Sequence, residues 1–219
     1  PGQEYHVISN DRNCSIETKP GTFYQINVIW IDNVKEFAPV TDGFHLSPVY
    51  QIQPFDLALK SKFRVGIRYD RDLVEHSNLG IYYYDGKEEK WVYTPTENNR
   101  RKQILTAELE KMDAVTIIQD LDSPQIKNTF PGNSGRYHIQ DVNRIEIEVD
   151  DSISGIESEE ASFDLLLNDN PVHPAYQPLK KTVSYNFDHP LKEGQHKIDF
   201  KVRDRMGNES AGTIYFSVY

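Results

Sequence analysis

Residues 194–219 read GQHKIDFKVRDRMGNESAGTIYFSVY, and this stretch decides the fold. In its first part Ile198, Phe200 and Val202 alternate with charged residues, and residues 214–218 repeat the alternation after a Met-Gly-Asn turn sequence. A period of two is typical of a β-strand with one face in a core and one in solvent. Two such strands around a turn indicate an antiparallel hairpin.

The same alternation occurs earlier in the second half of the chain. Ile145, Ile147 and Val149 are separated by glutamates, and similar runs cover 163–167 and 183–187. Turn-forming Asp, Asn, Pro and Gly residues separate these runs. Short strands with turns at this rhythm predict a Greek-key sandwich, so we expect residues 126–219 to form a C-terminal immunoglobulin-like domain.

The first half alternates less regularly but in the same sense. Residues 63–69 and 79–83 each have one apolar face, and the turn Asp85-Gly86 predicts a hairpin with 91–93. Ile26, Val28 and Trp30 would share the buried face of another strand. Residues 105–112 fit either a helix or a strand followed by a turn. These runs predict an N-terminal sandwich over residues 1–119.

Residues 120–125, Asp-Leu-Asp-Ser-Pro-Gln, have no apolar face and contain a Pro after an acidic pair, which predicts a linker. The predicted fold class is therefore all-β, with two immunoglobulin-like β-sandwich domains in tandem.

Composition excludes several partner classes. The chain has 219 residues and a formal net charge of -10, which disfavours nucleic acid and anionic membranes because both attract Lys and Arg. No apolar run approaches the roughly 18 residues of a membrane span. A single cysteine, Cys14, forms no internal disulfide. Because the sequence begins at Pro1 without a signal peptide, we interpret it as a piece of a larger exported protein.

Three motifs in the second half carry a resemblance to a known family. They are Ser154-Gly155-Ile156, the Pro-Leu-x-x-Gly-x-His sequence at 190–196, and the Val-x-Asp-x-x-Gly-Asn sequence at 202–208. This series resembles bacterial immunoglobulin-like domains. Together with residues 48–54 and 79–92, it resembles the C-terminal accessory region of exported lysostaphin-like (LytM-type) peptidases of Gram-negative bacteria. The resemblance implies a secreted or cell-envelope location.

The catalytic signature of those peptidases is missing from the sequence. Their zinc site needs an H-x-H pair, and none of the seven histidines forms one or an H-E-x-x-H motif. We therefore expect this chain not to be an enzyme, and expect any metallopeptidase domain of the parent protein to lie outside it.

Aspartates in the predicted linker, at the end of one predicted strand and in a predicted turn are the candidate metal ligands. Clustered oxygens can bind Ca²⁺, which takes about six to eight of them. The alternative, which we favour, is that Asp fills turns by hydrogen-bonding its own backbone. No cofactor is required by the sequence, and calcium is the one that it permits. The candidate ligands are Asp120, Asp122, Asp150, Asp151 and Asp204.

Aromatic residues of the predicted hairpin are the candidate ligand-binding residues. Tyr82 and Tyr84 should face away from Tyr83, close to Trp91, and exposed rings can stack on sugars. Cross-strand aromatic pairs also simply stabilise sheets, which is the favoured alternative.

We therefore predict a non-catalytic structural or interaction module, whose domains space or dock neighbouring domains or cell-envelope components. The alternative is a carbohydrate- or peptidoglycan-binding module that uses surface aromatics.

Overall fold

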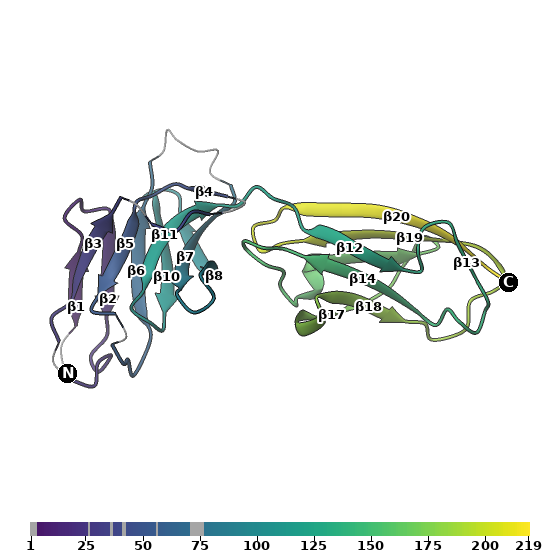
Figure 1. Cartoon of the computed structure of the whole chain (residues 1–219), viewed down its shortest axis with the longest axis horizontal. Helices are drawn as coiled ribbons and strands as arrows, with labels where there is room; N and C mark the ends of the chain where they lie inside the picture. Colours follow the sequence, from purple (N-terminus) through teal and green to yellow (C-terminus); the bar gives the residue numbers. More distant parts are fainter. Residues whose placement is uncertain (1–3, 26, 36, 41–42, 56, 71–76) are drawn as a thin grey trace. The chain divides into compact units, whose positions relative to one another are not determined.

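The computed structural model describes residues 4–25, 27–35, 37–40, 43–55, 57–70 and 77–219. The chain divides into two compact units, Pro1–Leu121 and Asp122–Tyr219. Helix is confined, among the described residues, to two short 3-10 turns, η2 (Glu160–Ser162) and η3 (Pro178–Lys180). Each unit contains two β-sheets (Figure 1), which confirms the predicted all-β class with a sandwich in each half.

The N-terminal unit packs a five-stranded sheet against a six-stranded one, with antiparallel pairing throughout the described strands. The first sheet has, in spatial order, β1 (Tyr5–Ile8), β2 (Cys14–Thr18), β6 (Phe63–Arg68), β10 (Ile104–Leu109) and β9 (Thr96–Asn99). The second has β3 (Trp30–Val34), β5 (Val49–Gln53), β11 (Ala114–Gln119), β7 (Leu79–Asp85) and β8 (Lys90–Thr94), and β4 (Phe44–His45) also pairs with β11.

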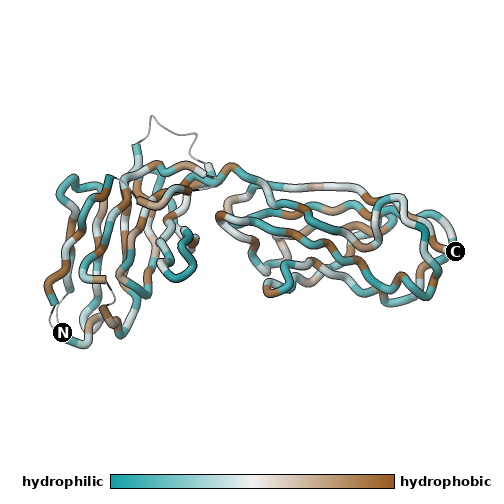
Figure 2. Tube along the Cα trace, viewed as in Figure 1, coloured by the Kyte–Doolittle hydropathy of each residue, from teal (hydrophilic) through white to brown (hydrophobic). Residues whose placement is uncertain are grey.

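Alternation explains how β6 is placed. Phe63, Val65 and Ile67 are at most 2% exposed and lie in the core between the sheets, whereas Arg64 and Arg68 face solvent. The hydropathy trace in Figure 2 shows the same change of character along the strands. The run 105–112, which fitted a helix or a strand, begins as strand β10.

The prediction for residues 26–30 was wrong in phase. Strand β3 begins at Trp30 and buries Ile31, whereas Trp30 is 44% and Val28 78% exposed. Ile26 lies outside the described residues. A period of two does not say which set of side chains faces inward. Here β3 is the last strand of its sheet, and its pairing with β5 opposite Ile52 sets the phase.

The C-terminal unit is a second sandwich. One sheet has β12 (Gln125–Phe130), β14 (Arg144–Asp150), β18 (Thr182–Asn186) and β17 (Ala175–Gln177). The other has β13 (Gly135–Tyr137), β20 (Glu209–Val218), β19 (Gly194–Arg203), β15 (Phe163–Leu167) and β16 (Asn170–Pro171), with β13 parallel to β20. Residues 120–124, between β11 and β12, form no strand.

The predicted hairpin at the end of the sequence is the longest element of this unit. β19 and β20 pair over ten residues each, from Gly194 opposite Val218 to Arg203 opposite Glu209. Ile198 and the residues that alternate with the charged ones are buried in the core, as the pattern predicts. The turn that joins the strands begins at Asp204, whose backbone N–H donates to the Asn208 carbonyl at 3.1 Å.

Candidate functional site

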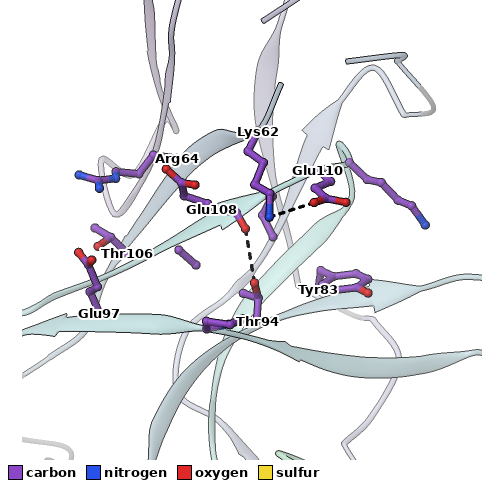
Figure 3. Close-up of a pocket in the computed structure, with 12 residues that line it drawn as sticks. Lys62, Arg64, Tyr83, Thr94, Glu97, Thr106, Glu108 and Glu110 are labelled. Carbon is purple, nitrogen blue, oxygen red and sulfur yellow. Dashed lines mark hydrogen bonds and ion pairs between the residues drawn. The ribbon is translucent and has the colours of Figure 1, made fainter. Parts of the chain in front are cut away.

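The N-terminal unit contains an open groove of about 510 Å³. Figure 3 shows Lys62, Arg64, Glu108 and Glu110 on one side of it, Thr94 and Tyr83 on the other, and Thr106 beside Glu97 on the neighbouring strand β9. The volume lies within the range of roughly 300–1,000 Å³ that small-molecule sites occupy. This groove is the candidate functional site.

The groove lies at a corner where the chain passes from one sheet to the other. β8 ends in the second sheet at Thr94, Pro95 interrupts the ladder because it has no N–H, and β9 begins in the first sheet at Thr96. The Thr96 hydroxyl fixes this corner, because it donates to the Thr94 carbonyl at 2.7 Å and accepts from the Ile81 N–H at 2.9 Å. The crossing places the solvent-facing side chains of β6 and β10 beside Tyr83 of the other sheet.

Charges of both signs line the groove and balance one another. Lys62 donates to Glu110 at 2.9 Å, and this bond raises the pKa of Lys62. Arg64 stands in register between two carboxylates, Glu17 on β2 and Glu108 on β10. The charged lining residues are three cations and three carboxylates: Lys62, Arg64 and Lys111, and Glu97, Glu108 and Glu110.

Apolar and hydroxyl groups complete the lining. Ala107 and Leu109 are buried, Pro95 is exposed, and the Tyr83 ring is half-buried against the core. The Thr94 hydroxyl donates to the backbone carbonyl of Glu108 at 3.5 Å, which links the two walls. The arrangement can hold a ligand by apolar contact with Tyr83 and Pro95 and by polar contacts with the charged side chains.

Two of the three predicted aromatic ligand residues are covered. Tyr82 has no exposed surface and Trp91 is 7% exposed, while Tyr84 is half-buried. Their rings lie together on the outer face of the second sheet, where Tyr84 contacts Trp91 edge-on at 5.3 Å. The expectation of surface rings is corrected for Tyr82 and Trp91, because a covered ring offers no face to a sugar.

The cover comes from a segment distant in sequence. Phe37 packs on both Tyr84 and Trp91, and the Trp91 ring N–H donates to the Ala38 carbonyl at 3.1 Å. His45 lies edge-on to Trp91 at 5.3 Å, and burial lowers the pKa of His45, although its bond to Ala38 acts in the opposite direction. These contacts bury the aromatic rings on the outer face of the second sheet in a small apolar cluster.

Two of the candidate metal ligands lie together in the C-terminal unit. Asp151 and Asp204 each offer a carboxylate oxygen within 4.8 Å of the other. Asp151 accepts from the backbone N–H groups of Ile153 at 3.2 Å and Gly155 at 2.6 Å. These bonds fasten the turn after β14, as the turn interpretation predicts.

Asp204 is held in the same manner. Its Oδ1 accepts from the N–H groups of Met206 at 2.8 Å and Asn208 at 2.9 Å, and its Oδ2 accepts from the Asn208 side chain at 2.7 Å. Burial raises the pKa of Asp204, while these bonds act to lower it. The carboxylate therefore serves the β19–β20 turn.

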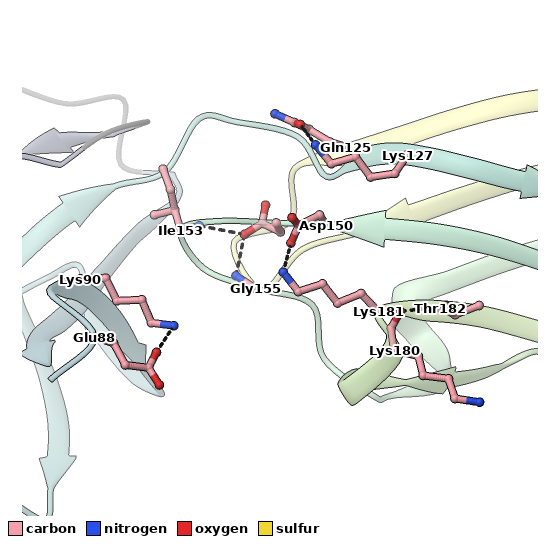
Figure 4. A network of polar contacts seen from close by, with 11 residues as sticks. Glu88, Lys90, Gln125, Lys127, Asp150, Ile153, Gly155, Lys180, Lys181 and Thr182 are labelled. Atoms are coloured by element: carbon pink, nitrogen blue, oxygen red, sulfur yellow. Dashed lines mark hydrogen bonds and ion pairs between the residues drawn. The ribbon is translucent and has the colours of Figure 1, made fainter.

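The remaining three candidates are Asp150, Asp120 and Asp122. Asp150 accepts from the Lys181 ammonium at 2.5 Å, and Figure 4 shows this pair. Asp120 is buried at the end of β11, where its N–H donates to the Asn78 carbonyl at 3.0 Å. Asp122 is exposed. Calcium binding stays a prediction for these residues.

Sequence reasoning did not single out the groove. Its charged residues belong to ordinary wet strand faces, and only the change of sheet at Pro95 brings them beside Tyr83. The one available signal was that Pro interrupts an alternating run between two strands.

No protein-family model matches the sequence. No curated protein is significantly similar to it. No helix among the described residues has both the length and the apolar character that crossing a membrane requires.

Three solved structures are similar to this chain at low identity. CopC from Methylosinus trichosporium OB3b is 15% identical, with a TM-score of 0.34, over 43% of this chain and 92% of that one. PcoC, a methionine rich copper resistance protein from Escherichia coli, is 15% identical, with a TM-score of 0.35, over 45% of this chain and 100% of that one. The extracellular domain of BT4673 from B. thetaiotaomicron is 12% identical, with a TM-score of 0.30, over 98% of this chain and 31% of that one.

At these TM-scores none of the similarities assigns the chain to a family or a function. The kind of fold that the structure shows is the β-sandwich, and the resemblance to the accessory region of lysostaphin-like peptidases stays a prediction.

Proposed function

We propose that the chain is a non-catalytic interaction module of a larger exported bacterial protein, and that its N-terminal sandwich binds a ligand in the groove. The observation that carries the proposal is the groove itself, about 510 Å³ in volume, lined by apolar groups and by charges of both signs. Ligand sites commonly combine an apolar lining with a few convergent polar groups.

The chemistry of the lining supports binding over catalysis. Among the described residues that line the groove there is no Ser, Cys or His, so the nucleophile–base pairs of common hydrolases are not assembled there. Thr94 is buried, and its hydroxyl is bonded to a backbone carbonyl instead of a base. The Lys62 ammonium is paired with Glu110.

We assign a structural role to the C-terminal sandwich. Its acidic turns are fastened by bonds within the chain, and a surface concavity among its described residues, about 170 Å³ near Glu146 and Glu148, is below the usual range of ligand sites. A sandwich of this kind spaces or docks neighbouring domains of the parent protein or cell-envelope components.

The location belongs to the same proposal. The motifs at 190–196 and 202–208 support a secreted or envelope protein of a Gram-negative bacterium, in which these domains accompany a cell-wall peptidase. Detection of the parent protein in periplasmic or secreted fractions tests this part.

Binding in the groove is tested without knowing the ligand. The full ¹⁵N-labelled chain is titrated with cocktails of fragment-sized sugars, amino acids and aromatic compounds, and amide shift changes are mapped on the structure. We expect them to gather on β6, β10 and residues 94–97, and Arg64→Gln to weaken them. Arg68→Gln, on the same face of β6 but outside the groove, is the matched control. Shift changes elsewhere, or none, would overturn the proposal.

A further inference from the structure

We infer that the groove binds a short, neutral oligosaccharide. This inference rests on the proposed function and names the ligand class of the same site. Three features carry it: the balance of charge in the lining, the position of the Tyr83 ring, and the hydrogen bonding of the β10 backbone.

The balance of charge favours a neutral ligand rich in hydroxyl groups. Three carboxylates and three cations line the groove, so a phosphate chain or a polyanion would meet Glu97 and Glu108 as well as Arg64. A sugar hydroxyl donates one hydrogen bond and accepts others, as a serine hydroxyl does. Each hydroxyl can therefore donate to a carboxylate and accept from a neighbouring cation, and such charge-assisted bonds are the strong ones.

The Tyr83 ring lies where a sugar would need an apolar surface. It is half-buried and stands across the groove from the β10 wall, with Pro95 and the buried Leu109 also contributing to the lining (Figure 3). One face of a pyranose ring is formed largely by C–H groups, so it packs on an aromatic ring while its hydroxyls reach the charged side chains.

The backbone of the wall disfavours a peptide that binds by adding a strand. Thr106 and Ala107 of β10 are paired on both sides, with β6 and with β9. The Glu108 carbonyl already accepts from the Thr94 hydroxyl. Strand addition needs a free row of N–H and C=O groups, and these β10 residues do not offer one, so recognition at this wall falls to side chains.

The backbone of the site is ordered before a ligand arrives. Arg64 and Glu108 project from paired strands, and Lys62 is bonded to Glu110. Less entropy is lost on binding when the backbone that carries the contacts is already ordered.

The test is isothermal titration calorimetry of the full chain with four neutral tetrasaccharides: β-1,4-glucose, α-1,4-glucose, β-1,4-xylose and β-1,4-N-acetylglucosamine oligomers. We expect one of them to bind, and Glu97→Gln and Glu108→Gln each to weaken it by about tenfold, the effect of losing one charge-assisted bond. Both residues are exposed, so the fold tolerates the changes. Glu193→Gln, an exposed change in the C-terminal unit, should leave affinity unchanged.

A second pair of variants isolates the ring. Tyr83→Phe keeps the aromatic surface and should retain affinity within about threefold, whereas Tyr83→Leu keeps the apolar packing and should lose about tenfold or more. Far-ultraviolet circular dichroism of both variants controls for folding.

Each outcome separates the ligand class from the binding site. Absence of heat with all four sugars, while fragments still shift groove amides, overturns the oligosaccharide and leaves the proposed function standing. The same holds if a strand-forming peptide binds instead. Sugar binding that is unaffected by the glutamine and leucine variants overturns the groove as the binding site, and with it both proposals.

Discussion

In the groove of the N-terminal unit, Glu97 and Glu108 face solvent, whereas in the C-terminal unit the carboxylates of Asp151 and Asp204 are turned onto backbone N–H groups. Both regions collect acidic side chains at the ends or edges of strands. They differ in what satisfies the oxygens: side-chain cations and water in the first, the chain's own amides in the second. Glu110, for example, pairs with Lys62 at 2.9 Å and remains largely exposed.

The difference teaches how to separate a binding surface from a structural turn. An exposed carboxylate exchanges water for a ligand at little expense to the fold, because surface ion pairs contribute only about 0–1 kcal/mol. A carboxylate that accepts several amide hydrogens holds the turn closed, and removing it leaves those donors unsatisfied. Four predictions sharpen this comparison.

The largest effect is expected at Asp204. Asp204→Ala removes the acceptor of the Met206 and Asn208 N–H groups and should lower the free energy of unfolding of the C-terminal unit by about 2–4 kcal/mol. Asp204→Asn keeps a carbonyl oxygen for the backbone donors and should lose much less. Urea unfolding followed by near-ultraviolet circular dichroism measures both. Equal losses for the two variants would contradict the role of the backbone bonds.

A smaller effect is expected from the backbone of the same turn. Gly207 has a φ of +90° with no atom within 4 Å of an added Cβ, so Gly207→Ala introduces backbone strain without a clash. We expect a loss of about 1 kcal/mol. Gly86→Ala, in the β7–β8 turn, also meets no atom within 4 Å and has no positive φ, so it should be close to neutral. Thermal denaturation compares them, and a Gly86→Ala effect as large as that of Gly207→Ala would refute the strain argument.

The pH dependence of stability provides the third prediction. Because burial raises the pKa of Asp204 above its ordinary value of 3.8, the folded state holds this proton more tightly than the unfolded state does. Its contribution to the free energy of unfolding should therefore grow as the pH falls through the raised pKa, and be complete below 3.8. Asp204→Asn should remove this component from urea midpoints recorded between pH 7 and pH 4. An unchanged difference between the two proteins across that range would disprove it.

The smallest effect on stability is expected in the groove. Glu110→Gln breaks the exposed pair with Lys62 and should change the free energy of unfolding by about 0.5 kcal/mol or less. The pKa of Lys62, which this bond raises, should fall, and ¹⁵N-detected titration of the ammonium group measures it. A destabilisation as large as that of Asp204→Ala would mean that this pair in the groove is structural.

The strands could be predicted because their alternation is strict where both sheets cover the apolar face. Val65 on β6 and Phe200 on β19 lie as their patterns indicate. The sequence could not predict that Val28 and Trp30 face away from the core. The reason is that β3 is an edge strand, and its pairing with β5 determines which of its residues face inward. A sequence pattern carries no information on that register.

The site could be predicted only in part, because it depends on contacts between distant segments. The turn role of Asp204 follows from local bonding and was accessible to sequence reasoning. The covering of Trp91 by Phe37, 54 positions earlier, was not, and neither was the corner at Pro95 that brings Tyr83 beside β10.

The pairing of β20 also decides how the C-terminal unit responds to tension. The two ends of the unit lie at opposite ends of this strand. Near its start, the Ser210 hydroxyl donates to the carbonyl of Pro124, close to the first residue of the unit; at its other end, Val218 precedes Tyr219, the last residue. β20 is paired along its ten residues with β19 on one side and, at its last three residues, with β13 on the other. A pull applied at both ends runs along the strand, so these bonds are sheared together instead of opening one after another like a zipper. Such geometry resists force, which would suit the structural role proposed for this sandwich.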